Sequence, residues 1–316
     1  MPKPFRWGIL GAAGINRRFI PGLKLAGHDI AIFGSRDPAK GRAAATEFGG
    51  ERSGTYDEVL AATDVDAVYI PLPNSLHVPW SIRAAEMGKH VLCEKPLAPT
   101  VAECEQMVAA AAKHGTHLVE AFMYRLHPQW NVVWEAIRSG RIGEIKTFHS
   151  SFQFSTRDRD NVRLNPSLAG GVLQDAGCYC INAARWFLGE PTRVRGFALD
   201  QQSTGVDTHC AAALEFPSGA LATLTCSFES AMVQSLSIIG SKGRIEVLEP
   251  FVQSGDATIR IVDASGPQTV TIPFVNQYAL ECVAMESLIK EGKPSLSPAT
   301  DAAGTQAVIA AWKSAS

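Results

Sequence analysis

Two short groups of residues in the sequence have side chains suited to proton chemistry. The first is Glu94-Lys95-Pro96, which follows the apolar pair Val91-Leu92. Because proline favours an extended residue before it, Lys95 is expected at the carboxyl end of a strand, the edge where open α/β sheets bind ligands. Burial there would lower the pKa of the lysine and suit it to proton transfer, while Glu94 would oppose that shift. A surface ion pair at a strand end is the alternative interpretation.

The second group is Asp175 and Tyr179, within a helix predicted over residues 171–188. Residues four apart share a helix face, so these two side chains are expected to be neighbours. A polar loop precedes the helix and contains Arg163 and Asn165. Taken alone, the tyrosine fits a core residue with a bonded hydroxyl, and the loop fits a solvated connection.

A glycine-rich turn near the amino end has the pattern of a dinucleotide site. The apolar strand expected over residues 5–10 leads into Gly11-Ala12-Ala13-Gly14-Ile15-Asn16, and a helix follows. Backbone N–H groups at such a helix start suit a pyrophosphate. The usual G-x-G-x-x-G pattern is broken, because Ala13 and Asn16 stand at its second and third glycine positions. A tight turn without a ligand is therefore the alternative.

The next strand, expected over residues 29–34, ends in residues that distinguish between the two nicotinamide dinucleotides. An NAD site usually has an acidic residue here for the ribose 2′-hydroxyl. The chain instead has Ser35 and Arg36, with Lys40 one turn further on. A hydroxyl and two cations suit a 2′-phosphate, so we expect NADP rather than NAD. Asp37 is the competing ribose ligand.

Alternating strands and helices through residue 122, including a helix over residues 38–48, predict a doubly wound parallel sheet of the α/β Rossmann type. The carboxyl ends of its strands should line one edge. From residue 145 onwards, hairpin signals predict an α+β domain with a mostly antiparallel, open-faced sheet. The strands expected there are residues 146–154, 193–199, 209–216, 221–228, 235–239, 244–248 and 257–262.

This pattern predicts two domains. Residues 1–125 are expected to bind the dinucleotide, and residues 126–316 are expected to bind substrate and to form the oligomer. The last helix, predicted over residues 298–312, could pack back on the first domain.

Composition argues against several classes of partner. The chain has 316 residues, 46% of them hydrophobic, and a formal net charge of −2. That balance gives no reason to expect a nucleic acid or an anionic membrane as partner. No uncharged apolar run reaches the roughly 20 residues of a membrane helix, and residues 1–6 lack the apolar core of a signal peptide. The seven cysteines show no metal-binding or redox spacing, so we expect a reduced, cytoplasmic protein without a metal.

Taken together, these motifs resemble those of the glucose–fructose oxidoreductase / inositol dehydrogenase / MocA family, in the family's order and spacing over nearly the whole chain. Tyr179, with Arg163-Leu164-Asn165-Pro166 before it, is similar to the branch of dihydrodiol dehydrogenases, NADP-linked aldose dehydrogenases and aldose–aldose oxidoreductases. Ala13 departs from the family pattern. The matching segments are Glu94-Lys95-Pro96, Pro73-Asn74-Ser75-Leu76-His77, residues 120–125 with His127-Pro128, and Gly170-Gly171 followed by Asp175 and Tyr179.

The resemblance implies an NADP-dependent oxidoreductase that transfers a hydride between the nicotinamide and a hydroxyl or carbonyl carbon of a sugar, an aldose or a cyclic polyol. It implies Tyr179 as general acid/base, Lys95 as its electrostatic partner and Asp175 as an orienting group, with the roles of Lys95 and Tyr179 exchangeable. It implies sugar contacts for Arg163 and Asn165. The implied cofactor contacts, besides the glycine turn and Ser35, Arg36 and Lys40, are Leu72, Asn74, His77, Glu94, Lys95 and Arg125.

Two other functions share most of these residues: a glycosidase that uses a retained nicotinamide for transient oxidation, and a non-catalytic NADP-binding sensor. His77 fits a core or capping role equally well. A second-domain sheet with one face on helices leaves its other face to be covered. We therefore also expect a homodimer or homotetramer formed through that sheet.

Overall fold

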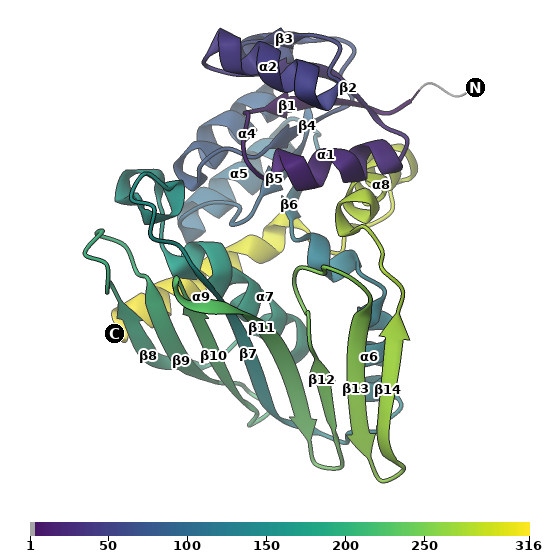
Figure 1. The fold of residues 1–316 in the computed structure, drawn as a ribbon, viewed down its shortest axis with the longest axis vertical. Helices are drawn as coiled ribbons and strands as arrows, with labels where there is room; N and C mark the ends of the chain where they lie inside the picture. Colours follow the sequence, from purple (N-terminus) through teal and green to yellow (C-terminus); the bar gives the residue numbers. More distant parts are fainter. Residues whose placement is uncertain (1–3) are drawn as a thin grey trace. The chain divides into compact units, whose positions relative to one another are not determined.

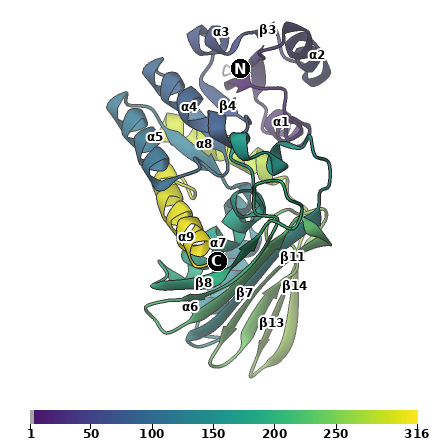
Figure 2. The ribbon, with the colours of Figure 1, turned by 90° about the vertical axis from the view of Figure 1, so that its left-hand side faces the viewer.

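The computed structural model describes residues 4–316 and divides the chain into two compact units (Figure 1, Figure 2). The first unit extends to Leu126 and also takes in Asn276–Ala303, and the second comprises His127–Val275 and Gly304–Ser316. The segment that returns to the first unit thus precedes the last helix, and most of the last helix belongs to the second unit. Of the segment examined for a signal peptide, residues 1–3 lie outside the described range.

Within the described residues, the first unit contains a six-stranded sheet whose neighbouring strands are all parallel. Trp7 of β1 pairs with Ile30 on one side and Ala67 on the other, so the sheet is wound in both directions from β1, as predicted. Its strands are apolar because helices cover both faces of a parallel sheet. In spatial order they are β3 (Ser53–Gly54), β2 (Asp29–Gly34), β1 (Arg6–Leu10), β4 (Ala67–Ile70), β5 (His90–Glu94) and β6 (Leu118–Ala121).

Polar residues at the helix starts explain where several helices of this unit begin. Thr55 and Glu58 form a reciprocal capping box, and Thr100 accepts from the N–H of Glu103. Such caps satisfy N–H groups that the first helical turn leaves open. The helices are α1 (Asn16–Leu25), α2 (Pro38–Phe48), α3 (Tyr56–Ala61), α4 (His77–Glu86), α5 (Val101–Lys113) and α8 (Gln277–Glu291).

Helix α8 joins the first unit through a close contact with α1. Gly22 of α1 has no room for a side chain, because a Cβ there would lie 2.7 Å from both the backbone nitrogen of Ala279 and Cβ of Tyr278. A second contact is polar, since Nε2 of His28 lies 3.0 Å from the carboxylate of Glu286 on α8. Helix α8 therefore packs on the first sheet unit although it follows the second sheet in the sequence.

The second unit contains, among the described residues, an eight-stranded sheet that is mostly antiparallel, as predicted. The exception is the parallel pair β7 and β10. In spatial order the strands are β14 (Gly266–Ile272), β13 (Ala257–Asp263), β12 (Arg244–Val247), β11 (Glu229–Gly240), β7 (Ile145–Ser155), β10 (Leu221–Ser227), β9 (His209–Glu215) and β8 (Arg193–Leu199).

Two features of this sheet differ from the prediction. Strand β14 was missed, because it is an edge strand that begins Gly266-Pro267 and is largely exposed, which weakens the alternation that identifies a strand. Strand β11 begins at Glu229 rather than near residue 235, and its pairing with β7 shifts register between Glu229 and Val233. An irregularity of that kind has no apolar pattern of its own.

Helices α6 (Gln129–Arg138), α7 (Cys178–Leu188) and α9 (Ala302–Ser314) pack on one face of this sheet (Figure 2). Trp312 of α9 donates from Nε1 to the carbonyl oxygen of Phe197 on β8, so the last helix lies almost wholly in the second unit. The opposite face exposes small or polar side chains such as Ala211, Thr223 and Ser235, together with the apolar side chains of Phe197 and Leu221. Among the described residues, no helix has both the length and the apolar character that crossing a membrane requires.

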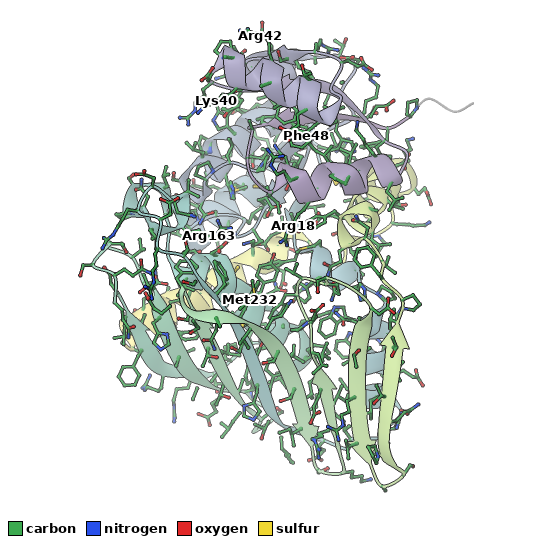
Figure 3. The ribbon with its side chains drawn as sticks, viewed as in Figure 1. Arg18, Lys40, Arg42, Phe48, Arg163 and Met232 are labelled. Atoms are coloured by element: carbon green, nitrogen blue, oxygen red, sulfur yellow. The ribbon has the colours of Figure 1, made fainter. Side chains whose placement is uncertain are left out.

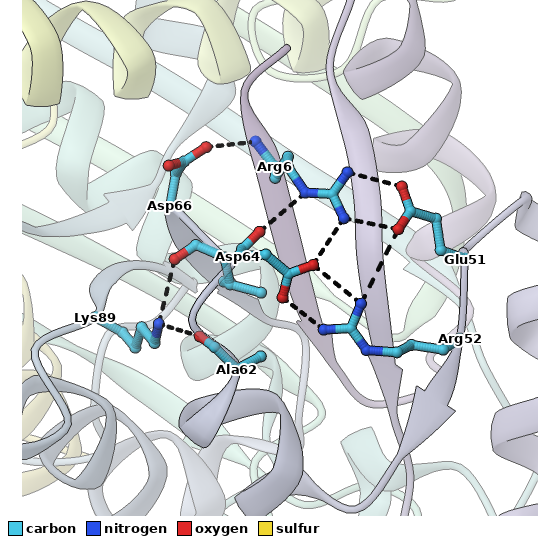
Figure 4. Close-up of polar contacts among 8 residues, drawn as sticks. Arg6, Glu51, Arg52, Ala62, Asp64, Asp66 and Lys89 are labelled. Carbon is cyan, nitrogen blue, oxygen red and sulfur yellow. Dashed lines mark hydrogen bonds and ion pairs between the residues drawn. The ribbon is translucent and has the colours of Figure 1, made fainter. Parts of the chain in front are cut away.

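A network of ion pairs joins the amino ends of the first sheet's strands (Figure 4). Arg6 forms two hydrogen bonds of 2.7 Å with Glu51 and lies 2.8 Å from Asp64. Arg52 binds Asp64 at 2.6 Å and holds the pKa of that carboxyl well below its usual range. Exposed pairs of this kind contribute only about 0–1 kcal/mol each. The network lies at the edge opposite the carboxyl ends of the strands, where open α/β sheets bind ligands.

Candidate active site

The glycine turn is shaped by contacts of its first residue. Gly11 has a φ of +122°, which residues with a side chain rarely adopt, and its N–H donates to Gly34 O at 3.0 Å. The buried carboxamide of Asn16 donates to Gly11 O at 2.8 Å. The N–H groups of residues 12–15 have no hydrogen-bond acceptor among residues 4–316, and a side chain at Gly14 would meet open space. Unused donors and close backbone approach fit a pyrophosphate.

The side chains of the residues after β2 differ in their hydrogen bonds and in their exposure to solvent. The carboxylate of Asp37 caps α2 by accepting from the N–H groups of Ala39 and Lys40 at 2.8 and 3.2 Å, and these bonds lower its pKa. Burial raises the pKa of Tyr56, and the hydrogen-bonded guanidinium of Arg36 counteracts that rise. Ser35 is buried, whereas Lys40 is exposed on α2 (Figure 3). The strand tip therefore presents two cations, while its acid is engaged in a helix cap.

His77 joins the carboxyl ends of β4 and β5. Its buried ring has Nδ1 2.9 Å from Pro96 O and Nε2 2.8 Å from Leu72 O. Burial lowers the pKa of His77, and a neutral imidazole donates through one nitrogen only. The side chain of Leu72 packs beside the glycine turn, since a Cβ on Gly11 would lie 2.9 Å from it. The ring of His77 thus occupies a core position, and the side chain of Leu72 packs directly against Gly11 of the glycine turn.

Glu94 ends β5, and Lys95 follows it at the carboxyl edge of the sheet. The hydroxyl of Tyr69 donates to Glu94 Oε1 at 2.5 Å, and the N–H of Lys95 lies 3.3 Å from Glu94 Oε2. Burial and the Glu94 carboxylate raise the pKa of Tyr69 well above its usual value. The ring of Tyr69 stacks on Phe19 at 3.7 Å, and Asn74 begins a short 3₁₀ turn after β4. Tyr69, which no motif indicated, therefore fixes the carboxylate beside Lys95.

Arg125 lies in the 3₁₀ turn Met123–Leu126 after β6 and is buried. Its guanidinium donates to Leu296 O at 3.0 Å and to Asp301 Oδ2 at 2.7 Å. These bonds tie the segment after α8 to the end of β6 within the first unit. A contact between Arg125 and the nicotinamide stays a prediction.

In the second unit, the structure joins Arg163 to Asp175. Nε of Arg163 donates to Asp175 Oδ2 at 2.7 Å, and its guanidinium carbon lies 5.9 Å from the ring centroid of Phe154 (Figure 3). Asp175 lies in a π-helical turn, Leu173–Gly177, rather than in the regular helix that the sequence predicts. Such turns are frequent at functional sites. The twelve-residue separation of the pair explains why its contact could not be read from the sequence.

Asn165 has a local role in the same loop. Its Oδ1 accepts from the N–H and the hydroxyl of Ser167 at 2.9 and 2.7 Å, so the side-chain oxygen caps a short turn. The backbone carbonyl of Asn165 also accepts from the N–H of Gly170 at 3.0 Å. The loop is therefore folded on itself, and the amide NH₂ is the group of Asn165 that these bonds leave to a ligand.

Tyr179 lies on α7 with only 4% of its surface exposed. Phe152 of β7 contacts the phenol ring edge-on at a centroid distance of 5.4 Å. Phe251, from the loop after β12, contacts it at 5.3 Å. The structure thus places the tyrosine against two phenylalanine rings, neither of which was indicated by a sequence motif.

Asp207 is a further residue that sequence reasoning missed. Its Oδ2 accepts from the N–H of Leu173 at 2.7 Å, and its backbone carbonyl accepts from Val172 at 2.7 Å. Its carboxylate also lies 2.7 Å from Nζ of Lys313 on α9. Asp207 therefore caps the π-helical turn that carries Asp175, a role that an aspartate in a polar loop does not reveal in sequence.

Comparison with known proteins agrees with the architecture of both units. Residues 5–122 match a family described as an oxidoreductase family with an NAD-binding Rossmann fold, and residues 130–246 match the GFO/IDH/MocA C-terminal domain. An uncharacterized oxidoreductase of Rhizobium meliloti is 40% identical over 300 residues, covering 92% of this chain and 90% of that protein. D-xylose 1-dehydrogenase (NADP(+)) 2 of Haloferax volcanii is 38% identical over 292 residues, covering 91% and 90%.

A solved structure gives the same result. The crystal structure of a 3-ketoreductase from Actinomadura kijaniata, in complex with NADP and TDP-benzene, matches with a TM-score of 0.91 at 30% identity and covers 99% of this chain and 98% of that one. The family resemblance predicted from the motifs is thereby confirmed. The chain belongs to the GFO/IDH/MocA family and is an NAD(P)-dependent oxidoreductase.

Proposed function

We propose that this enzyme transfers a hydride between NADP and a hydroxyl or carbonyl carbon of a sugar, an aldose or a cyclic polyol. The observation that carries the proposal is the ion pair of Arg163 with Asp175, one helical turn ahead of Tyr179. A guanidinium and a carboxylate hydrogen-bond to sugar hydroxyls, and a phenol can exchange a proton with one of them. The similar xylose dehydrogenase supports the sugar substrate by its name.

NADP is preferred over NAD in this proposal because of the residues at the tip of β2. Arg36 and Lys40 would bind the 2′-phosphate, and Ser35 would hydrogen-bond to it. Asp37, the competing ribose ligand, already caps α2. The glycine turn Gly11–Asn16 would hold the pyrophosphate through its unused N–H groups. The similar 3-ketoreductase was crystallised with NADP, which supports the same choice.

Proton transfer is assigned to Tyr179. When bound, the nicotinamide supplies the hydride acceptor or donor. Free tyrosine has a pKa of about 10 and is a poor base at neutral pH, but a neighbouring ammonium lowers such a pKa by roughly 1–3 units. We assign that ammonium to Lys95, and the exchanged roles remain the alternative. Asp175 would orient the substrate hydroxyl together with Arg163.

The remaining residues would position the two reactants. Glu94, held by Tyr69, and Asn74 would bind the nicotinamide ribose, and Arg125 would reach the carboxamide of the nicotinamide. Leu72 and His77 would shape the floor of the cofactor site. Arg163 and the amide NH₂ of Asn165 would contact the sugar.

A second substrate class is favoured by one specific observation. The 3-ketoreductase whose structure matches with a TM-score of 0.91 was crystallised with a TDP derivative, so the carbonyl of a nucleotide-linked keto sugar is the second candidate. Nothing in residues 4–316 favours the glycosidase over these two. Membership of an oxidoreductase family replaces the non-catalytic sensor as an interpretation.

We also propose that the enzyme is a homo-oligomer formed through the face of the second sheet that its own helices do not cover. Small side chains such as Ala211, Thr223 and Ser235 let another sheet or loop approach that face closely. A monomeric mass by light scattering at micromolar concentration would contradict this. The seven cysteines are all buried and free of disulfide bonds. This supports the proposal that the enzyme acts in a reducing compartment such as the cytoplasm.

The experiment that tests the proposed function measures reduction of NADP and of NAD against a panel of aldoses and cyclic polyols, and oxidation of NADPH with keto sugars free or nucleotide-linked. We expect turnover with NADP and a free sugar. Tyr179→Phe should retain NADPH binding and lose turnover. Full activity of Tyr179→Phe would refute the acid/base assignment, and turnover with nucleotide-linked substrates only would favour the second candidate.

Before these assays, nucleotide released from the denatured protein should be identified by absorbance and mass. Stoichiometric NADP would mean that the cofactor is retained, so that substrates should be tested in oxidant and reductant pairs. NAD in its place would contradict the assignment of Arg36 and Lys40.

A further inference from the structure

The loop that follows β12, residues 249–254, is fastened by the side chains of three glutamines. Gln234 of β11 accepts at Oε1 from the N–H groups of Phe251 and Val252 at 3.1 and 2.9 Å, and donates from Nε2 to Val252 O at 2.5 Å. Gln129 of α6 donates to the carbonyl oxygens of Glu249 and Pro250 at 3.4 and 3.3 Å. The third, Gln253, donates to the carbonyl of Glu249 at 2.6 Å. The three hydrogen bonds of Gln234 are thus made to the backbone of Phe251 and Val252.

The side chain of Phe251 is completely buried and forms one wall around Tyr179. Its ring lies 5.3 Å from the ring of Tyr179 and stacks on Phe152 at 5.5 Å with an interplanar angle of 20°. Phe152 in turn meets Tyr179 edge-on at 5.4 Å. The three rings therefore contact one another pairwise, and a shift of any one changes the space that the phenol occupies.

Gln234 connects this aromatic group to the sheet. Gln234 lies opposite Phe152 in the register of β11 and β7. Its side chain also hydrogen-bonds to the backbone of Phe251. A glutamine can accept and donate at the same time, which the opposed N–H and C=O groups of the loop require. Leucine at this position would leave these backbone groups without partners.

We propose that Gln234 is a positioning residue for Tyr179, which acts by holding Phe251 against the phenol. The inference rests on the proposed function of Tyr179 as acid/base. Phe251 and Phe152 restrict the phenol to one orientation, and Gln234 fixes the backbone from which Phe251 projects. Misplacement of a reacting group by about 1 Å can cost roughly a hundredfold in rate.

The test compares Gln234→Leu, Gln234→Glu and the wild type, with Gln268→Leu as matched control. Gln268 is a glutamine of the same sheet, on the edge strand β14, where it accepts from Arg141 at 3.0 Å. We expect Gln234→Leu to lose about 10- to 100-fold in kcat for the sugar. KM for NADP should stay unchanged, because the cofactor residues belong to the other unit. Gln268→Leu should behave as wild type.

Gln234→Glu gives a signature that a general loss of stability would not. A carboxylate retains the acceptor for Phe251 and Val252 but opposes the carbonyl of Val252. Protonation restores a donor, so kcat of Gln234→Glu relative to wild type should rise as the pH falls. A ratio that is independent of pH, or unchanged kcat in Gln234→Leu, would overturn the proposal.

Nitration of tyrosines with tetranitromethane, mapped by mass spectrometry, tests the packing without any turnover. All five tyrosines are buried, so the wild type should react slowly. Gln234→Leu and Phe251→Leu should both expose Tyr179 while the other four stay protected. Equal protection of Tyr179 in these folded variants would refute the role of Gln234. If the wild type reduces no NADP with any sugar but the nitration result holds, the proposed function fails and the packing inference stands.

Discussion

The substitution Asn16→Ala should show whether the glycine turn binds the cofactor or is only a structural turn. Asn16 is fully buried, and its Nδ2 donates to Gly11 O at 2.8 Å. Gly11 has a φ of +122°, a conformation that residues with a side chain rarely adopt. Alanine removes the only side-chain donor to that oxygen among the described residues, and the turn loses its internal fastening.

The magnitude follows from the burial of the oxygen that loses its partner. Leaving a buried carbonyl unsatisfied costs about 1–3 kcal/mol. We expect the free energy of unfolding to fall by about that amount. If the turn becomes ordered again only when NADPH binds, the dissociation constant should rise by roughly 5- to 150-fold for the same energy. Asn16→Asp should lose more affinity, because it brings an anion towards the pyrophosphate as well as removing the donor.

The assays are urea unfolding followed by circular dichroism and NADPH titration followed by nicotinamide fluorescence. Asn131→Ala is the control, since Asn131 is exposed on α6 and should change neither quantity. A loss of stability without loss of affinity would show that Asn16 supports the turn but that the turn does not bind the cofactor. Unchanged values for both would refute the reasoning from the buried hydrogen bond.

Four further substitutions test other parts of the structure. Arg36→Ala should raise KM for NADP by about 10- to 100-fold and leave KM for NAD unchanged, whereas Asp37→Asn should alter neither; a loss of NAD use in Asp37→Asn would make it the ribose ligand. Gly22→Ala places a Cβ 2.7 Å from the backbone of α8 and should lower the free energy of unfolding by about 1–3 kcal/mol in urea, so an unchanged midpoint would contradict the close contact. Burial and the Glu94 carboxylate raise the pKa of Glu281 well above its usual 4.5. Between pH 4.5 and the raised pKa, the folded protein holds a proton that the unfolded chain has lost, so the free energy of unfolding falls as the pH rises. Glu281→Gln should therefore gain stability relative to wild type as the pH rises above the usual pKa of 4.5. A difference in melting temperature between the two proteins that does not change with pH would refute this.

Local signals explain why much of the first unit could be predicted from sequence. Residues 38–48 were predicted as a helix, and α2 has those bounds, since Asp37 and Pro38 start it and Gly49 in a left-handed conformation ends it. Thr55 and Glu58 likewise mark the start of α3 with a capping box. The strands of the parallel sheet could be read from their apolar runs, because both faces are covered.

Features that depend on contacts distant in sequence were missed. Helix α8 was assigned to the second domain, and tertiary contacts such as the one with Gly22 reveal that it packs on α1. Strand β14 is mostly exposed, and its partner β13 supplies the hydrogen bonds that define it. The role of Phe251 depends on the side chain of Gln234, a residue of a different strand. No local pattern contains such information.

The pair Asp175 and Tyr179 shows how a prediction from residue spacing can rest on incomplete geometry. The spacing of four predicts a shared face only if the helix is regular, but Asp175 lies in a π-helical turn and Tyr179 lies in the α-helix that follows. The orientation of Asp175 is instead set by Arg163, and the start of the turn is set by Asp207. A sequence motif can therefore indicate which residues suit proton chemistry, because residue type decides that. Their orientation is decided by tertiary hydrogen bonds, so variants of Asp207 should impair the site although Asp207 belongs to no motif.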